Sequence, residues 1–266
     1  MTIPNILTIA GSDPSGGAGI QADLKTIAAN GGYGMSVVTA LTAQNTDGVR
    51  SIQIVDCAFV RDQITAVLDD IRIDAIKIGM LANAGLISTV ADCLRRAEGV
   101  PVILDPVCMA KGGARLLEPG AISALKSELA PLATILTPNL PEAAELLAID
   151  EPASRKDMTL AANALLSFGS RNILLKGGHL GSRKSCDLLV SNDTQAWLEA
   201  ERIDTANTHG TGCTLSSAIA TLMPQSTSVL EAVAAAKDYI HGAILHSGML
   251  SVGRGHGPVH HAWRRV

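Results

Sequence analysis

Residues 4–23, with the sequence PNILTIAGSDPSGGAGIQAD, place a short apolar run directly before a glycine-rich loop and the start of a second apolar pattern. Residues 5–10 are typical of a buried strand, and the spacing of apolar residues from 18 to 30 predicts a helix. A strand, a glycine-rich loop and a helix in this order form the repeating unit of a parallel sheet, so this stretch predicts an α/β fold.

The same alternation continues along the chain. Further strands are predicted at residues 35–43, 49–55, 74–78, 100–104, 134–137, 172–175 and 186–190. Further helices are predicted at residues 58–69, 84–97, 121–129, 141–147, 158–168, 211–223 and 229–250, with a non-helical tail at 253–261. This pattern predicts a mostly parallel sheet covered by helices on both faces, with a hairpin near residues 35–55. No linker or repeat interrupts it, so we expect a single domain over residues 1–266.

The composition excludes several classes of protein. The 266 residues are 47% hydrophobic but only 2% aromatic, and they carry a net charge of −4. A chain with this charge and so few aromatic rings lacks the features that bind nucleic acid. No apolar stretch of about 18 residues predicts a membrane span, and the first residues lack the basic segment of a signal peptide, so we expect a cytoplasmic protein. Five widely spaced cysteines without a CxxC pair argue against a disulfide framework and a zinc ribbon.

Polar and glycine residues follow the predicted strands, where parallel α/β sheets bind their ligands. These residues are Gly11-Ser12-Asp13, Gln44-Asn45, Gly79-Met80, Asp105-Pro106, Pro138-Asn139 and Lys176-Gly177-Gly178. The first loop lets the backbone approach a ligand closely. It matches neither the Walker A pattern nor GxGxxG, so the standard phosphate and dinucleotide motifs are excluded.

The segment THGTGC at residues 208–213 precedes an Ala- and Ser-rich helix. Glycines at a helix start let backbone N–H groups converge on one point, where they stabilise the charge of a transferring phosphoryl group. Cys213, in the first helical turn, is expected to have a lowered pKa. The alternative is an ordinary Thr N-cap with a glycine turn.

Three further positions have both a functional and a structural interpretation. Asn139 and Glu142 are suited to a magnesium–water shell, but Asn, Pro and Glu at this spacing also form a capping box. Lys176 can extend toward phosphate or remain a solvated residue at a strand end. Asp105 needs a cationic partner or a metal if it is buried. His256, His260 and His261 are expected to be exposed or to line a crevice rather than to bind a metal.

Several motifs together resemble one known family. They are GSDPSGGAGIQADLKT (11–26), TALTAQNT (39–46), KIGML (77–81), LDPV (104–107), TPNLPEA (137–143), LKGGH (175–179), NTHGTGCTLSSAIA (207–220) and GHGPVHH (255–261). In this order they look like the hydroxymethylpyrimidine/phosphomethylpyrimidine kinases of thiamine biosynthesis, and the likeness covers essentially the whole chain. The resemblance implies a ribokinase-like three-layer sandwich and ATP-dependent phosphorylation of 4-amino-5-hydroxymethyl-2-methylpyrimidine to its monophosphate and then its diphosphate.

The resemblance also implies the members of the site. The anion hole is expected at Gly210, Thr211 and Gly212, with Lys176 on phosphate and Mg²⁺ at Asn139, Glu142 and Asp105. Further contacts to ATP are expected from Asn139, Thr211 and Lys237. The pyrimidine is expected to contact Gly11, Ala18, Asp23, Gln44, Met80 and Val107.

Cys213 stands where sugar kinases of the superfamily carry an aspartate base. A thiolate there would accept the hydroxymethyl proton in the first transfer. The second acceptor is an ionised phosphate and needs no base, so Cys213→Ala is expected to impair the first transfer more than the second. The family further suggests a homodimer. A pyridoxal kinase of the same superfamily and a non-catalytic pyrimidine-binding protein remain the alternatives.

Overall fold

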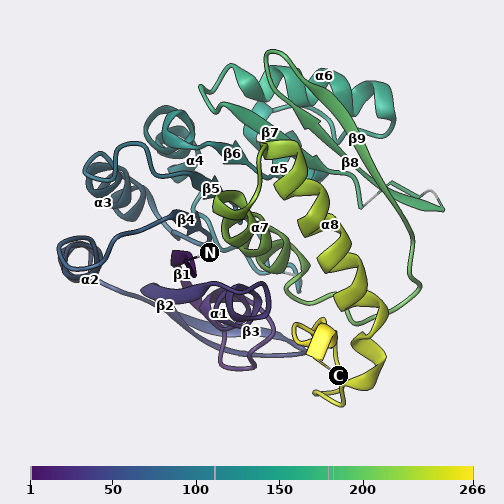
Figure 1. Cartoon of the computed structure of the whole chain (residues 1–266), viewed down its shortest axis with the longest axis horizontal. Coiled ribbons are helices and arrows are strands. Elements are labelled where there is room, and N and C mark those ends of the chain that lie inside the picture. Colours follow the sequence, from purple (N-terminus) through teal and green to yellow (C-terminus); the bar gives the residue numbers. More distant parts are fainter. Residues whose placement is uncertain (1, 111, 179, 182, 266) are drawn as a thin grey trace.

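The computed structural model describes residues 2–110, 112–178, 180–181 and 183–265, and these contain one nine-stranded sheet (Figure 1). Its strands, in spatial order, are β3 (Gly48–Ile54), β2 (Tyr33–Asn45), β1 (Asn5–Ser12), β4 (Ala75–Ile78), β5 (Val102–Leu104), β6 (Ile135–Leu136), β7 (Asn172–Lys176), β8 (Lys184–Val190) and β9 (Gln195–Glu201). The central strands from β2 to β7 pair in parallel. β3, β8 and β9 pair antiparallel at the two ends of the sheet.

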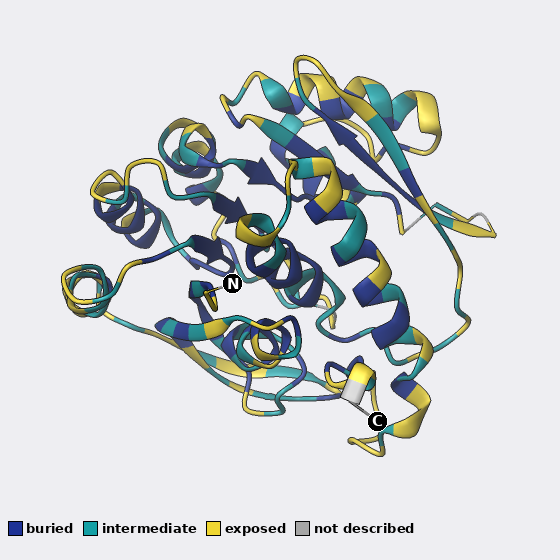
Figure 2. Cartoon of the chain, viewed as in Figure 1, coloured by how far each residue is buried: buried dark blue, intermediate teal, exposed yellow. Residues whose placement is uncertain are grey.

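Helices cover both faces of this sheet. One face carries α1 (Gly19–Ala29), α7 (Thr211–Leu222) and α8 (Val229–Leu245). The opposite face carries α2 (Cys57–Leu68), α3 (Ala84–Leu94), α4 (Ala121–Ala124), α5 (Leu140–Leu147) and α6 (Arg155–Leu166). Figure 2 shows buried residues on the strands and on the sides of the helices that face them. The expected three-layer α/β sandwich with a mostly parallel sheet is therefore confirmed.

Small aliphatic side chains fill the two cores. Because side chains alternate along a strand, Leu7 and Ile9 of β1 join one hydrophobic cluster while Ile6 joins the other. α7 lies over β4 and β5, and its buried Ser216, Ser217 and alanines let the helix approach the sheet closely. Close packing of small residues thus fills a core to which the chain's six aromatic residues can contribute little.

The structure corrects the predicted elements at three places. The strand β9 was not predicted, because most of its residues are exposed or partly buried at the sheet edge. The last long helix ends at Leu245 rather than at 250, and a separate one-turn helix follows at Ser247–Met249. The predicted helix 121–129 is a short α-helix that continues into the π-helical turn Leu125–Leu129. The hairpin of β2 and β3 and the non-helical tail are confirmed.

None of the helices within the described ranges has the length and apolar character needed to cross a lipid bilayer.

Candidate active site

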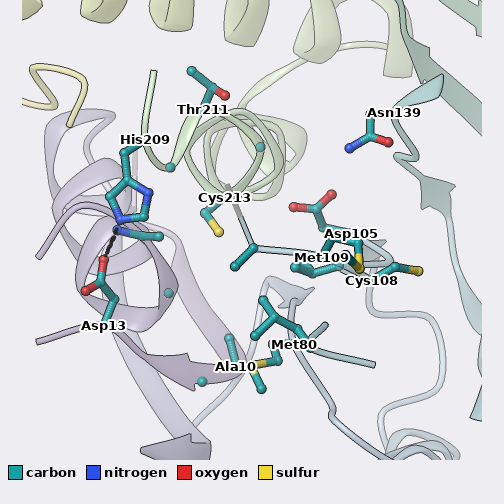
Figure 3. A pocket seen from close by; sticks show the side chains of 18 of the residues that line it. Ala10, Asp13, Met80, Asp105, Cys108, Met109, Asn139, His209, Thr211 and Cys213 are labelled. Carbon is teal, nitrogen blue, oxygen red and sulfur yellow. Dashed lines mark hydrogen bonds and ion pairs between the residues drawn. The ribbon is translucent and has the colours of Figure 1, made fainter. Parts of the chain in front are cut away.

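A cavity of about 390 Å³ lies beyond the carboxyl ends of the central strands (Figure 3). Residues of β1, β2, β4 and β7 and of the segments that follow β5 and β6 line it, and the N-terminus of α7 closes one side. The cavity brings together most of the predicted site residues, namely Gly11, Ala18, Gln44, Met80, Asp105, Val107, Asn139, Glu142, Lys176, Gly210, Thr211, Gly212 and Cys213. Asp23 and Lys237 are not among its lining residues.

The loop before α7 has the geometry of an anion site. Gly210 is the N-cap residue, with φ of +78°, and no side chain from the described residues caps the helix. The N-terminal N–H groups of α7 therefore face the cavity without a side-chain acceptor, and the helix dipole adds positive potential there. A Cβ at Gly210 would overlap the carbonyl oxygen of Gly17, so only glycine fits. The alternative of a Thr N-cap is wrong.

Lys176 and Asp105 form a buried ion pair opposite that loop. Lys176 Nζ lies 2.8 Å from Asp105 Oδ1, and the side chains are 14% and 2% exposed. Thr137 Oγ1 also donates to Asp105 Oδ1 at 3.2 Å. Burial alone would lower the pKa of Lys176, but the Asp105 and Glu142 carboxylates outweigh it and raise that pKa. Lys176 is therefore a fixed cation in the cavity and not a solvated residue.

Asn139 and Glu142 form the capping box that was the alternative for this motif. Asn139 Oδ1 accepts from the Glu142 N–H, and Glu142 Oε2 accepts from the Asn139 N–H, both at 2.8 Å. The same box places the Glu142 carboxylate in the cavity, where it is 6% exposed. The capping and functional interpretations of this motif are thus compatible.

The acidic wall fits a divalent cation. Burial and the neighbouring Asp105 carboxylate raise the pKa of Glu142 to about 7, although Lys176 opposes the shift. Two carboxylates therefore share one lysine, and a cation would relieve the remaining repulsion. Within the described residues, no group of three or more His, Cys, Asp or Glu side chains has metal-binding geometry. This donor set suits Mg²⁺, which keeps several waters and is bound through one or two carboxylates plus substrate phosphates.

Apolar side chains line the opposite end of the cavity. Met80 and Val107 line it together with the Gly11 backbone, and a Cβ at Gly11 would lie 3.1 Å from Met80 Sδ. The Thr39 hydroxyl donates to the Met80 carbonyl at 2.7 Å and holds this wall in place. Gln44 supplies an amide at the rim. The space suits a planar ring that also needs hydrogen bonds.

The expected lowering of the Cys213 pKa is wrong. Burial raises the pKa of Cys213 to about 11, and the Asp23 and Asp105 carboxylates add to the rise. The Lys77 ammonium and an N–H from Gly19 oppose the shift but do not overcome it. Position at a helix N-terminus is therefore outweighed by desolvation, and Cys213 is a thiol at neutral pH.

Asp23 lies behind the cavity wall and makes no surface in it. Its carboxylate binds Lys77 Nζ at 2.9 and 3.0 Å and accepts from Thr8 Oγ1 at 2.6 Å and Ser217 Oγ at 2.7 Å. Both members of the ion pair are fully buried. The predicted contact between Asp23 and the pyrimidine is corrected: Asp23 holds Lys77, which does line the cavity.

Lys237 is also engaged outside the cavity. Its Nζ lies 2.6 Å from Asp187 Oδ2 and 3.3 Å from Ser185 Oγ. The other carboxylate oxygen of Asp187 accepts from the Gly177 N–H at 3.0 Å, next to Lys176. Lys237 therefore supports the turn after β7, which corrects its predicted contact with the nucleotide.

Two polar pairs of the site were not predicted. The first contains Lys77, which interrupts the apolar strand β4. A charged residue within a buried strand was the signal that could have indicated this pair. Asp13 and His209 form a buried pair, Oδ2 to Nε2, at 2.8 Å, and both line the cavity. They stand 196 residues apart in the sequence, so no local pattern indicates their contact. His179, the last residue of the LKGGH motif, lies outside the described residues.

The tail histidines differ in their surroundings. His256 is exposed, whereas His261 is buried and bonds Thr214 Oγ1 at 3.1 Å through Nε2. His260 is partly buried in a second cavity behind the first loop. This agrees with the expectation that they are exposed or line a crevice.

Comparisons with known proteins show which family this chain resembles. The family model of phosphomethylpyrimidine kinase matches residues 13–260. The chain is 48% identical over 261 residues to the hydroxymethylpyrimidine/phosphomethylpyrimidine kinase of Escherichia coli, covering 97% of this chain and 98% of that one. It is 50% identical over 257 residues to the thiamine biosynthesis bifunctional protein ThiED of Geobacter sulfurreducens, covering 97% of this chain and 52% of that protein. The ADP complex of Bacillus subtilis pyridoxal kinase superposes with a TM-score of 0.91 and 37% identity over 99% of both chains.

Proposed function

The chain belongs to the family of phosphomethylpyrimidine kinases, and on that premise we propose how its cavity performs the reaction. The enzyme phosphorylates hydroxymethylpyrimidine to the monophosphate and then to the diphosphate, in thiamine biosynthesis. One observation carries the proposed mechanism: a single cavity joins a helix N-terminus, a buried lysine–aspartate pair and an apolar wall that contains Met80 and Val107.

ATP is the proposed phosphoryl donor. The ADP complex of a pyridoxal kinase with the same fold supports a nucleotide here. Phosphoryl transfer passes through a loose transition state, so catalysis rests on positioning and charge stabilisation. In this chain Gly210, Thr211 and Gly212 present backbone N–H groups to the transferring phosphoryl group, and Lys176 neutralises phosphate oxygens.

Asp105 and Glu142 are the proposed holders of Mg²⁺. The cation, when bound, neutralises phosphate charge. Asn139 contributes by capping α5, which fixes the Glu142 carboxylate. The proposed role of Asn139 is thus to orient the metal-binding carboxylate.

The pyrimidine is proposed to lie on Gly11 and Ala18 between Met80 and Val107. Gln44 offers both a donor and an acceptor, which matches a ring nitrogen beside an exocyclic amine. Apolar walls supply desolvation and dispersion, and the amide distinguishes one heteroaromatic ring from another.

Cys213 is proposed to contact the acceptor oxygen as a neutral thiol. The oxygen forms its bond to the γ-phosphorus while the bond to the leaving ADP oxygen breaks, and in the first transfer the hydroxyl proton passes late to an oxygen of the transferred phosphoryl group, as a loose transition state allows. With a pKa of about 11, the thiol is not a preformed base. Cys213→Ala is therefore expected to slow both transfers to a similar extent. A much larger loss in the first transfer would support the thiolate base instead.

A comparison of acceptors tests the function. Hydroxymethylpyrimidine, its monophosphate and pyridoxine are offered separately with ATP and Mg²⁺, and ADP release is followed. We expect turnover of the first two. The structural likeness to pyridoxal kinase favours pyridoxine as the competing acceptor, and turnover of pyridoxine alone would refute the proposal. Lys176→Met serves as the inactive control.

The remaining proposals concern the whole molecule. A homodimer is supported by apolar side chains exposed at the β3 end of the sheet, where Leu41 and Ile54 are 52% and 38% exposed and Phe59 of α2 is 60% exposed. Light scattering of the native chain and of Leu41→Glu tests it. A cytoplasmic location is proposed because five free thiols suit a reducing compartment. A single domain is proposed because one nine-stranded sheet runs through the described residues.

A further inference from the structure

Three segments that lie far apart in the sequence meet at His209. They are the first glycine-rich loop at residues 11–19, the loop at 207–213 that precedes α7, and the tail at 256–261. The His209 N–H donates to the Gly257 carbonyl at 3.0 Å, and His209 pairs with Pro258 in a parallel bridge. The His209 ring points the other way, toward Asp13 in the first loop (Figure 3).

Asp13 organises the first loop through both oxygens of its carboxylate. Oδ1 accepts from the N–H and the hydroxyl of Ser15, at 2.9 and 2.7 Å. Oδ2 accepts from the Ala18 N–H at 2.8 Å and from His209 Nε2 at 2.8 Å. Asp13 is 2% exposed and His209 is 6% exposed. One buried carboxylate therefore shapes the loop and also connects it to the loop before α7.

The two loops also touch through their backbones. A Cβ at Gly17 would overlap the His209 ring, and a Cβ at Gly210 would overlap the Gly17 carbonyl oxygen. Ala18 and Gly19 line the acceptor end of the cavity, and Gly210 lines the phosphoryl end. Any shift at this contact therefore changes the distance between the two ends.

His209 does not complete a catalytic triad with Cys213. Its Nε2 is engaged by Asp13, while the charged groups that act on the thiol are Lys77, Asp23 and Asp105. The thiol also receives an N–H from Gly19. The pair is thus placed to fix geometry and not to transfer a proton to or from the acceptor.

We propose that the hydrogen bond between Asp13 and His209 is a positioning contact that sets the acceptor loop against the N–H groups holding the transferring phosphoryl group. This rests on the proposed function, since it concerns the approach of the acceptor oxygen to the γ-phosphorus. Reacting atoms must sit about 3–3.5 Å apart, and a misplacement of about 1 Å lowers a rate by about 100-fold. Loss of the pair is therefore expected to lower kcat, while ATP and the pyrimidine keep their own contacts in the cavity.

The test compares His209→Ala with His209→Gln in both transfers. Gln can donate through Nε2 to Asp13, so it keeps the link without an imidazole ring. We expect kcat to fall about 10- to 100-fold in the Ala variant and to stay within about threefold of native in the Gln variant. KM for ATP and for the pyrimidine should change by less than about threefold in both. Added imidazole should raise kcat of the Ala variant, because it refills the space beside Asp13.

Ser170→Ala is the matched control. Ser170 is 5% exposed, and its hydroxyl donates to the Ala130 carbonyl at 2.8 Å, on the opposite face of the sheet from α7. This variant loses a buried hydrogen bond without touching the cavity, so its kcat should remain native. Thermal unfolding of all variants, followed by circular dichroism, reports how much each one is destabilised.

Three results would overturn the proposal. One is a raised KM for the pyrimidine with native kcat in His209→Ala. Another is a Gln variant as slow as the Ala variant, with no effect of imidazole. The third is a kcat loss in Ser170→Ala equal to that in His209→Ala. If native enzyme phosphorylates pyridoxine alone, the assigned substrate fails, but the same variants measured with pyridoxine still test the positioning role.

Discussion

Replacing Lys77 by Met should strongly destabilise the protein. Lys77 and Asp23 are both fully buried, and the ammonium contacts both carboxylate oxygens. Met preserves most of the side-chain volume but removes the only cation that the structure places against Asp23 within the described residues. The carboxylate then keeps its bonds from Thr8 and Ser217 and loses its counter-charge.

The magnitude follows from that burial. Breaking a buried ion pair by removing one partner destabilises a protein by about 3–5 kcal/mol, because the remaining charge is left without compensation. Two hydroxyl donors remain on Asp23, so we expect the lower half of this range, about 3–4 kcal/mol. The free energy of unfolding is measured by urea denaturation at pH 7, followed by circular dichroism.

Two further variants make this prediction refutable. Lys77→Met combined with Asp23→Asn removes both charges and should recover at least half of the loss, since neutral replacements of buried pairs are often tolerated. Arg72→Met breaks the exposed pair with Asp74, where Arg72 is 67% exposed, and should lose less than about 1 kcal/mol. A double variant as unstable as the single one, or a Lys77→Met loss no larger than that of Arg72→Met, would show that the buried charge is not the cause.

Three other changes have expected outcomes. Burial lowers the pKa of His261 from 6.5 to about 4, so the unfolded chain binds the proton first and native stability falls as the pH drops through this window. Between pH 7.5 and pH 5 this loss in the free energy of unfolding is about 2 kcal/mol. Urea denaturation of His261→Gln at the two pH values should show a loss that is smaller by that amount. Gly210→Ala should lower kcat by more than about 100-fold, because the left-handed backbone and the overlap with Gly17 displace the N–H groups; native circular dichroism with native kcat would contradict this. Lys237→Met should destabilise the fold by about 3 kcal/mol, because it leaves the buried Asp187 carboxylate without its cation. The same variant should change KM for ATP by less than about threefold. A large rise in KM with native stability would instead indicate that Lys237 contacts the nucleotide.

Most of the sheet was predictable because the buried strands carry strong local patterns. β1, β4, β5 and β7 are nearly continuous apolar runs bounded by polar or glycine residues, and each was predicted within about two residues. β9 lacks such a run, since an edge strand is exposed on part of its surface and takes polar residues. Its place in the sheet depends on pairing with β8, which no local pattern encodes.

The site was predictable where a residue's role depends on its position at a strand or helix end. Lys176, Asp105 and Gly210 follow this rule and line the cavity as expected. Asp23 and Lys237 do not, because each is held by a partner far away in the sequence. For Cys213 the local feature was identified correctly, but burial by distant segments reverses the direction of its pKa shift.

The contact between the loop before α7 and the tail makes the anion hole depend on a segment that supplies none of the proposed substrate contacts. The His209 N–H is held by the carbonyl of Gly257, and the His209 backbone pairs with Pro258. The anion hole thus depends on Gly257 and Pro258, which follow every strand of the sheet in the sequence. A chain cut before residue 257 still contains every residue proposed to touch substrate, yet it lacks the segment that holds His209. Proteolysis within the tail is therefore expected to lower activity while leaving every proposed substrate contact in place.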